Sequence, residues 1–394
     1  MSRTLRVVVA PDSFGGALDS VGVAAAIAAG WSGVRPDDEI LQRPMADGGE
    51  GTLAAVAAAL GDAAQRRSVE TTDALGRPIS AEWLLLDGGR SAFIEMAAAS
   101  GLARLAPDER TPDNARLAST RGTGDLVGAA LDAGVERITI GLGGSATTDG
   151  GSGLLRWLGL VLLDGDGGEL TDGGAALSTI GPISGGSVDE RLQRTRIVIA
   201  SDVTNPLCGP RGAAATYGPQ KGADEATVVE LDASLAAWGR WIERATGRLV
   251  ADIPGAGAAG GTTAGLLGFT SALVRPGIEV VAELVGLADE LESADLVITG
   301  EGRADEQTLH GKTAIGVATL AGPRRTPVVL LCGSLGPGAA ALDAATSLTV
   351  VQPIIDRPMD LAEAMAETER LLVAAAGRLA RTVGIGLLQS QPDK

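Results

Sequence analysis

The stretch that decides the fold lies near the start of the chain and reads Leu-Arg-Val-Val-Val-Ala-Pro-Asp-Ser-Phe from residue 5 to residue 14. Its apolar first part, Leu5–Ala10, has the length of a buried strand. A polar loop that begins at Pro11 ends this strand, and an Ala-rich helix is predicted over Val21–Trp31. A buried strand followed by a loop and a helix is typical of a parallel α/β sheet.

The same pattern returns near the end of the chain and again after the first helix. An Ala-rich helix is predicted at Thr52–Leu60, directly after a Gly-rich loop. Because strands alternate with helices, these parts of the chain predict a parallel sheet with helices on both faces. The later segments are a strand at Asp295–Thr299, a loop at Gly300–Gly311, a helix at Lys312–Leu320 and a strand at Pro327–Leu331.

The middle of the chain has a different pattern, with signals for antiparallel strands. The apolar runs Ile79–Leu86 and Ser91–Met96 flank Asp-Gly-Gly-Arg, which is a hairpin signal. Leu160–Leu163, before Asp-Gly, indicates a second hairpin. Short buried strands are predicted at Ile138–Ile140 and Ile197–Ala200. A chain of 394 residues is long for one core, so two domains are expected. We predict an inserted α/β domain over residues 66–284, within a discontinuous domain of residues 1–65 and 285–394.

Composition excludes several classes of protein. The chain has 32 basic and 49 acidic residues, a net charge of −17 and only nine aromatic residues, which argues against a nucleic-acid partner. No apolar run reaches the roughly 18 residues of a membrane helix, and the start of the chain resembles a strand, not a signal peptide. Cys208 and Cys332 lack metal-type spacing, so a reduced cytoplasmic protein is the simple interpretation. With His310 as the one histidine, zinc chemistry and a Ser-His-Asp triad are improbable.

Five loops combine glycine with acids or hydroxyls, and four of them directly follow predicted strands. Glycine lets backbone N–H groups approach a phosphate closely, and carboxylates can hold Mg²⁺ or accept a hydroxyl proton. Ordinary turns explain any one loop equally well, but five together favour a site at the carboxyl ends of the strands. The loops span residues 11–13, 46–52, 141–153, 201–223 and 299–312.

Two known fingerprints match these loops in part. Gly311-Lys312-Thr313 does not complete the NTPase phosphate loop, because the glycine that this motif needs at position 306 is Glu306. Gly141–Ala146 fits the Gly-x-Gly-x-x-Ala form of the dinucleotide fingerprint, and Asp164 or Asp166 would contact the ribose. An NAD(P)-dependent oxidoreductase of a small hydroxy acid is therefore one alternative function.

Lysine is very scarce, since only 3 of the 32 basic residues are lysine. Lys221 and Lys312 both lie in Gly-rich polar loops, where a compact ammonium suits a phosphate contact. The alternative is that both are ordinary surface lysines. His310, next to the second of these lysines, is interpreted as structural.

Taken together, the loops resemble those of bacterial glycerate kinases of the glycerate 2-kinase type. Each motif is short, but six occur in the family's order and cover the chain to about residue 335. The matching residues are Ala10–Phe14; Ala46–Thr52; Gly143–Gly151; Asp202–Leu207; Gly218–Ala223; and Thr299–Arg303 with Asp305, Gln307–Leu309 and Gly311–Lys312.

The resemblance implies ATP-dependent phosphorylation of D-glycerate, at the 2-hydroxyl, with Mg²⁺. It also implies two dissimilar α/β domains, the first Rossmann-like, with the active site in the cleft between them. Three positions depart from the family pattern. Gly15 stands where the family commonly has lysine, Thr148 where it has asparagine, and Tyr217 where it has phenylalanine.

Residue chemistry and the matching positions together define the candidate site. Asp202 and Asp149 are both candidates for the general base, and Lys312 completes the catalytic set. The metal candidates are Asp47, Asp202 and Glu301. Substrate and phosphate contacts are expected from Asp12, Ser13, Gly48, Gly49, Glu50, Gly51, Gly143, Gly144, Ser145, Thr147, Asn205, Lys221, Arg303, Asp305 and Gln307. A non-catalytic sensor of a sugar acid or nucleotide is the second alternative function.

Overall fold

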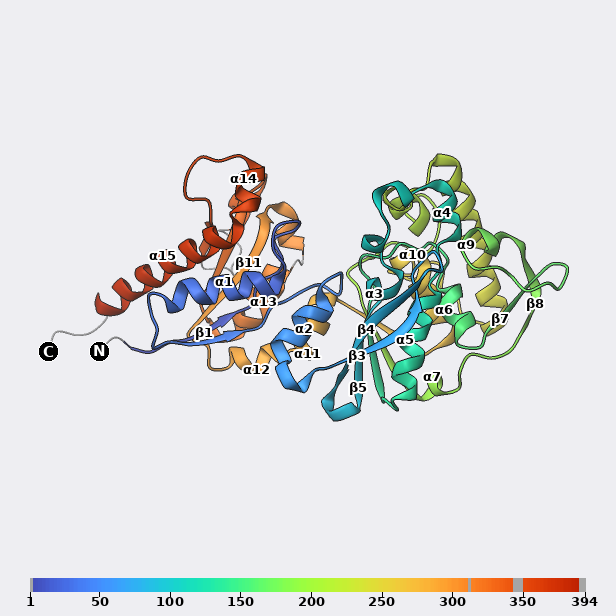
Figure 1. The fold of residues 1–394 in the computed structure, drawn as a ribbon, viewed down its shortest axis with the longest axis horizontal. Helices are drawn as coiled ribbons and strands as arrows, with labels where there is room; N and C mark the ends of the chain where they lie inside the picture. Colours follow the sequence, from blue (N-terminus) through green and yellow to red (C-terminus); the bar gives the residue numbers. More distant parts are fainter. Residues whose placement is uncertain (1–2, 311–312, 343–349, 390–394) are drawn as a thin grey trace. The chain divides into compact units, whose positions relative to one another are not determined.

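The computed structural model describes residues 3–310, 313–342 and 350–389, and the chain divides into two compact units (Figure 1). Unit 1 contains Met1–Asp47, Ala54–Gly61 and Ile278–Lys394. Unit 2 contains Gly48–Leu53 and Asp62–Gly277. The sequence prediction had put residues 48–53 in the first domain. They lie in unit 2 because their backbone packs against the strand ends of that unit, as the candidate site shows below.

Unit 1 is built on a five-stranded sheet with the order β13-β12-β11-β1-β2. Every neighbouring pair in this sheet is parallel, as the alternation of strands and helices predicts. Its strands are β1 (Arg6–Val9), β2 (Glu39–Gln42), β11 (Leu296–Ala304), β12 (Val328–Leu335) and β13 (Val350–Pro353).

The core of unit 1 lies between this sheet and a pair of packed helices, α1 and α15. The two helices approach so closely that a Cβ added at Gly30 of α1 would lie 2.2 Å from the carbonyl oxygen of Val373 in α15. Trp31, at the end of α1, is fully buried and donates its indole N–H to Asp38 at 2.9 Å. The helices are α1 (Ser20–Ser32), α2 (Thr52–Leu60), α11 (Gly277–Leu284), α12 (Leu287–Leu291), α13 (Thr313–Ala321), α14 (Leu361–Ala366) and α15 (Thr368–Gln389).

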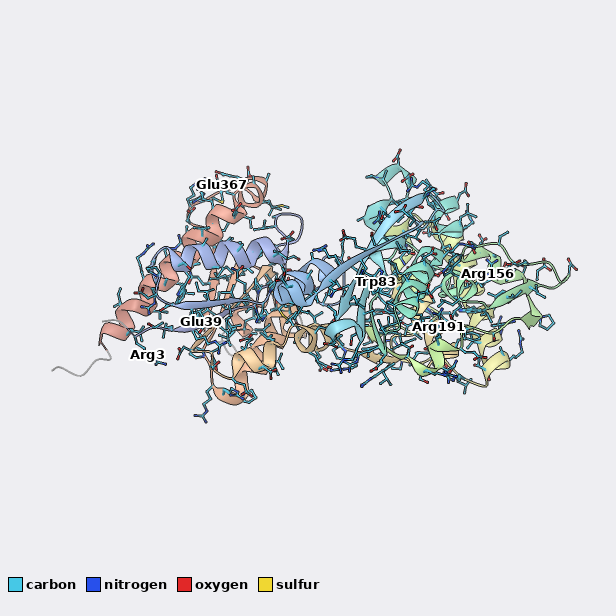
Figure 2. The ribbon with its side chains drawn as sticks, turned by 60° about the horizontal axis from the view of Figure 1, so that its bottom comes forward. Arg3, Glu39, Trp83, Arg156, Arg191 and Glu367 are labelled. Atoms are coloured by element: carbon cyan, nitrogen blue, oxygen red, sulfur yellow. The ribbon has the colours of Figure 1, made fainter. Side chains whose placement is uncertain are left out.

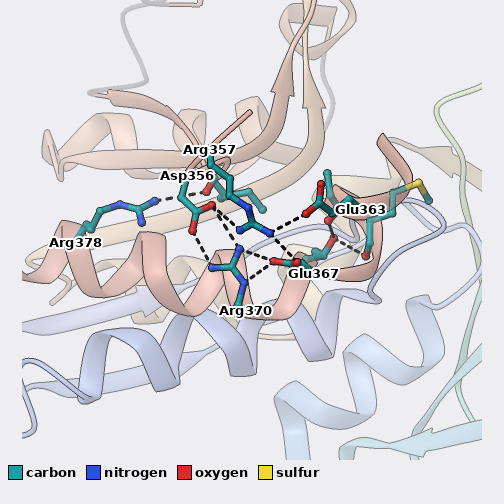
Figure 3. Close-up of polar contacts among 10 residues, drawn as sticks. Asp356, Arg357, Glu363, Glu367, Arg370 and Arg378 are labelled. Carbon is teal, nitrogen blue, oxygen red and sulfur yellow. Dashed lines mark hydrogen bonds and ion pairs between the residues drawn. The ribbon is translucent and has the colours of Figure 1, made fainter. Parts of the chain in front are cut away.

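Charged side chains join the segment after β13 to the start of α15 (Figure 3). Arg370 contacts both Asp356, at 2.8 Å, and Glu367, while Arg357 contacts Glu363 at 2.8 Å and Glu367 at 2.9 Å. These groups are mostly exposed to solvent. Exposed ion pairs stabilise a fold only weakly, so the network orients α14 and α15 more than it holds the unit together.

Unit 2 contains a mixed six-stranded sheet with the order β10-β9-β6-β5-β4-β3. Strands β3, β4 and β5 pair antiparallel, whereas β5, β6, β9 and β10 pair parallel. A separate antiparallel pair is formed by β7 and β8. The strands are β3 (Gln65–Thr72), β4 (Pro78–Leu86), β5 (Ser91–Glu95), β6 (Arg137–Gly141), β7 (Val161–Asp164), β8 (Ile180–Gly185), β9 (Arg196–Ala200) and β10 (Leu273–Arg275).

Helices cover this sheet and enclose a large apolar core. Trp238 and Trp241 of α9 stack with ring centroids 5.2 Å apart, and Phe269 of α10 packs beside both. Trp83 of β4 is also buried in this unit (Figure 2). The helices are α3 (Ala97–Ser100), α4 (Pro112–Leu117), α5 (Arg121–Asp132), α6 (Ser152–Trp157), α7 (Arg191–Arg194), α8 (Ala213–Tyr217), α9 (Glu225–Thr246) and α10 (Ala258–Phe269). Among the described residues, no helix has the length and apolar character needed to span a bilayer.

The predicted fold class is confirmed, since the structure combines a parallel sheet with a mixed sheet that has antiparallel elements. One local prediction was wrong. Residues 300–304, expected as loop, continue β11, because Gly300 to Ala304 pair in parallel with Leu331 to Leu335. The second predicted hairpin is present, because Leu163 and Glu169 form an antiparallel bridge on either side of the turn that begins at Asp164.

Candidate active site

Three parallel strands of unit 2 end side by side at one edge of the sheet. Their register pairs Glu95 of β5 with Gly141 of β6, and Gly141 with Ala200 of β9. The predicted 141–153 loop follows β6 and the predicted 201–223 loop follows β9. Carboxyl ends of parallel strands are where α/β proteins bind ligands, so this edge is the first candidate site.

Two Gly-rich loops are in direct backbone contact at this edge. The N–H of Gly143 donates to the carbonyl of Gly48 at 3.2 Å. A Cβ added at Gly143 would lie 2.3 Å from the Cα of Gly49, and one added at Gly48, whose φ is +87°, would lie 2.9 Å from the carbonyl oxygen of Ala200. Only glycine allows this approach. Gly144 faces Glu50 across the same contact, so the predicted residues of both loops come together.

Glu95 is a functional candidate that the sequence analysis missed. Its side chain is buried and accepts hydrogen bonds from the N–H groups of Gly51, at 3.2 Å, and Leu53, at 2.9 Å. Burial raises the pKa of the Glu95 carboxyl, and the nearby charge of Glu50 raises it further. This carboxyl therefore fixes the 48–53 loop against β5. The available signal was an acid at the end of an otherwise apolar strand run.

Asp149 lies inside the loop that follows β6 and is fully buried. Its Oδ2 accepts from the N–H and the hydroxyl of Thr120, both at 2.8 Å, and its Oδ1 accepts from the N–H of Gly151 at 3.1 Å. Burial raises the pKa of this carboxyl. A substrate hydroxyl has no access to it here, so the geometry favours a loop-positioning role over the expected role as base.

Lys221 is buried beneath the same loop. Its Nζ donates to the carbonyl oxygen of Thr147 at 2.6 Å and to the hydroxyl of Ser145 at 3.0 Å. Burial lowers the pKa of Lys221 to about 8, and the charge of Asp149 opposes this shift. The sequence predicted a phosphate contact, but the structure directs the ammonium into the 145–149 loop. Lys221 thereby joins two of the predicted phosphate-binding residues, Ser145 and Thr147.

Asp202 follows β9 and keeps an exposed side chain, whose Oδ1 accepts from the N–H of Gly277 at 3.1 Å. Asn205, in the same loop, donates to the carbonyl oxygen of Arg211 at 2.7 Å and accepts from the hydroxyl of Tyr217 at 2.9 Å. Tyr217 therefore stabilises the loop through a hydroxyl that phenylalanine lacks. Of the two candidates for the base, Asp202 is the accessible one.

Unit 1 presents a second set of predicted residues at the end of β1. Asp12 accepts from the hydroxyl of Thr313 and from the N–H of Ser13, at 2.5 and 2.6 Å. Burial raises the pKa of Asp12, and the charge of Asp47 adds to this effect. The two carboxylates are therefore close enough to interact. Ser13 and Asp47 are exposed at the surface.

The last predicted motif forms the end of β11 and the turn after it. Glu301 is buried and accepts from the hydroxyl of Thr308 at 2.8 Å. Arg303, 58% of whose side chain is exposed, pairs with Asp305 at 3.1 Å, and Asp305 also accepts from the N–H of Gln307. The motif is thus one hydrogen-bonded turn with an accessible guanidinium. Lys312 lies outside the described residues.

Metal binding by the candidate acids would need further ligands. Within the described ranges, no three His, Cys, Asp or Glu side chains gather closely enough to hold a metal ion. Mg²⁺ in phosphoryl-transfer sites needs only one or two carboxylates, because phosphate oxygens and water complete its shell. Asp47, Asp202 and Glu301 are oxygen donors of the right kind for such an ion.

The dinucleotide fingerprint fails in its structural context. That motif requires a helix that opens within its glycines, whereas α6 begins only at Ser152, after a long loop. Asp164, the expected ribose contact, ends β7 and accepts from the N–H groups of Asp166 and Gly168 at 2.9 and 2.8 Å. Its carboxylate therefore closes a local turn.

Parallel strands that end in packed glycine loops and carboxylates are typical of the class of α/β enzymes that bind small anionic ligands at the carboxyl ends of the strands. More particularly, the chain belongs to the glycerate kinase family, because the model described as "Glycerate kinase family" matches residues 7–384. The resemblance inferred from the motifs is therefore confirmed, and the chain is a kinase. Neither the oxidoreductase nor the sensor alternative receives support.

Individual relatives agree with this assignment. The chain is 43% identical over 387 residues to the glycerate kinase of Bacillus subtilis, covering 96% of this chain and 99% of that one. It is 44% identical over 331 residues to the glycerate 2-kinase of Escherichia coli, covering 84% and 86%. A solved structure described as a putative glycerate kinase 2 from Salmonella typhimurium matches with a TM-score of 0.85 and 42% identity, covering 98% of this chain and 99% of that one.

Proposed function

We propose that this protein transfers the terminal phosphoryl group of ATP to the 2-hydroxyl of D-glycerate. The similarity to a glycerate 2-kinase over most of both chains supports the substrate and the position of transfer. In the structure, the observation that carries the proposal is the paired glycine loop next to Asp202. The fixed backbone N–H groups of this loop can bind the oxygens of a small anion, and the accessible carboxylate of Asp202 can accept a proton.

In the proposed reaction, the 2-hydroxyl oxygen of glycerate attacks the terminal phosphorus of ATP. One oxygen–phosphorus bond forms, the bond to the ADP oxygen breaks, and the hydroxyl proton passes to Asp202. Such transfers depend on positioning and charge neutralisation more than on covalent chemistry. Lys221 and Asp149 hold the loop in place, and Arg303 offers an accessible positive charge.

We further propose that Mg²⁺ is required, because it neutralises phosphate charge when bound. Asp47, Asp202 and Glu301 are the candidate ligands. A cytoplasmic location is also proposed, supported by the free thiols of Cys208 and Cys332, since unpaired cysteines are typical of a reducing compartment.

The test is ADP release from ATP with a panel of small hydroxy acids, followed by phosphorus NMR of the product. We expect D-glycerate to be the best substrate and 2-phosphoglycerate to be the product. Formation of 3-phosphoglycerate would refute the proposed position of transfer. Absence of ADP release with glycerate, alongside release with another acid, would refute the substrate.

A further inference from the structure

A second polar cluster lies at the opposite edge of the unit 2 sheet, where the parallel strands begin. The register pairs Ser91 of β5 with Arg137 of β6, and Arg137 with Arg196 of β9. Residues paired across neighbouring strands point to the same face of a sheet. The topology therefore sets two arginines side by side. Arg90, from the turn before β5, adds a third.

These side chains line a hollow of about 260 Å³. The hollow is open to solvent, since most of its lining residues are exposed, and it has room for a small metabolite. The lining residues are Asp87, Arg90, Ser91, Glu136, Arg137 and Arg196.

The arrangement of charge in this hollow is unusual for so acidic a chain. Among the described residues, none of the three guanidinium groups makes an ion pair, although the chain carries a net charge of −17. Like charges directly opposite each other in neighbouring strands destabilise a sheet. By contrast, Arg66 on β3 pairs with Glu82 on β4 at 2.8 Å.

The two acids of the lining leave an excess of positive charge. Asp87 is already engaged, since its carboxylate accepts from the hydroxyl of Ser91 at 2.6 Å and its carbonyl accepts from Nε of Arg90 at 3.3 Å. Glu136 is the second acid. Three guanidinium groups against two carboxylates favour an anion, and the planar guanidinium fork matches phosphate and carboxylate oxygens.

We propose that this hollow binds a small acid that carries both a phosphate and a carboxylate. The phosphate would lie between Arg137 and Arg196, where it offsets their mutual repulsion, and the carboxylate would reach Arg90. The site is separate from the candidate active site, because it lies at the other ends of β5, β6 and β9. The inference stands on register, charge and volume, and does not depend on the proposed activity.

The test is isothermal titration of the full chain at fixed ionic strength, with 3-phosphoglycerate and inorganic phosphate as probes. The double variant Arg137→Gln with Arg196→Gln is compared with the wild type. Its matched control is Arg240→Gln with Arg244→Gln, which removes two exposed arginines of α9 in the same unit. Both variants keep the candidate active site, so binding of the probe there contributes equally to each.

We expect the hollow variant to lose one binding event, or to bind 3-phosphoglycerate at that site at least about tenfold more weakly, while the control binds as the wild type does. In the wild type, 3-phosphoglycerate should bind more tightly than inorganic phosphate, because its carboxylate adds a contact. Identical isotherms for hollow variant and wild type would overturn the proposal, and equal affinity for the two probes would overturn the assigned ligand class.

A variant that keeps the charge guards against misfolding. Arg137→Lys with Arg196→Lys retains both positive charges, so this variant should fold. Because it lacks the guanidinium fork, it should bind 3-phosphoglycerate more weakly than the wild type does. The glycerate KM of both hollow variants should remain within about twofold of the wild-type value. A large change in KM would place the probe in the active site and refute a separate one.

Discussion

The two candidate regions are built in different ways. In unit 2, the contact is between backbones, because Gly143 lies against Gly48 and Gly49 with no room for a side chain. The buried Lys221 holds the loop after β6 through a hydrogen bond to the carbonyl oxygen of Thr147. In unit 1, the functional groups are side chains at the ends of strands and in the turns after them, positioned by side-chain hydrogen bonds such as that between Glu301 and Thr308. The unit 2 region therefore depends on close backbone contacts that leave no room for side chains, whereas the unit 1 region supplies charged side chains.

This difference has a consequence for how each region tolerates change. A loop positioned by close backbone contact cannot accept even a methyl group, since the atoms in the way are not the ends of flexible side chains. A side chain on a turn can be replaced while the backbone stays in place. We therefore expect substitutions in unit 2 to cost more activity than substitutions in unit 1.

The largest effect is expected for Asp202→Asn, which removes the proposed base of unit 2. Loss of a positioned base typically costs on the order of 10²–10⁴-fold in rate. Because Asp202 is exposed, thermal unfolding should be nearly unchanged. The measurement is the steady-state kcat of variant and wild type, determined from ADP release. Turnover near that of the wild type would remove Asp202 from the mechanism.

The second prediction concerns Gly143→Ala. The new Cβ would lie 2.3 Å from the Cα of Gly49, so the two loops must separate. A displacement of about 1 Å at a catalytic loop costs roughly 10²-fold in kcat/KM. The matched control is Gly165→Ala in the same unit, because a Cβ there meets nothing within 4 Å. Equal activities of the two variants would show that loop contact does not shape the site.

Lys221→Met should reduce kcat about tenfold, because Ser145 and Thr147 lose their common donor. The burial of Lys221 also predicts how the stability of the fold depends on pH. Burial lowers the pKa of Lys221 to about 8 from the 10.5 expected when unfolded, so between these values the unfolded chain holds a proton that the folded chain has lost. Wild-type stability should therefore rise with pH across that window, relative to the variant.

Urea unfolding of both proteins at pH 7.5 and pH 10 measures this difference. Each unit of pKa shift corresponds to about 1.4 kcal/mol, so the relative gain is on the order of 3 kcal/mol. Parallel pH dependences of wild type and variant would contradict the assignment of a buried, weakly basic lysine.

Much of this architecture could be predicted from local sequence patterns. Leu5–Ala10 indicated β1, and Asp-Gly-Gly-Arg indicated the turn between β4 and β5, because both signals act within a few residues. The burial of Asp149 and the docking of residues 48–53 on unit 2 depend on contacts between distant segments. Glu95 was missed for the same reason, since only the folded register brings it to the 48–53 loop.

A smaller effect is expected in unit 1 from Glu301→Gln, which keeps the shape of the side chain and removes its charge. If Glu301 helps to hold Mg²⁺, kcat/KM should fall about fivefold and recover in part at higher Mg²⁺ concentration. The control is Asp305→Asn, which removes the carboxylate that pairs with the exposed Arg303. For this variant we expect kcat/KM to change by less than about threefold. A loss for Glu301→Gln that Mg²⁺ does not relieve would exclude this residue as a ligand.

The smallest effect is expected in the ion-pair network at the start of α15, which contains none of the candidate site residues (Figure 3). Arg370→Gln removes the contacts with Asp356 and Glu367, but these charges are exposed and therefore screened by solvent. The unfolding temperature should fall by at most about 2 °C, and the difference from wild type should vanish at 1 M salt. Activity should not change. A large, salt-independent loss of stability would mean that side chains on the surface of unit 1 hold its helices in place as firmly as backbone contacts hold the loops of unit 2.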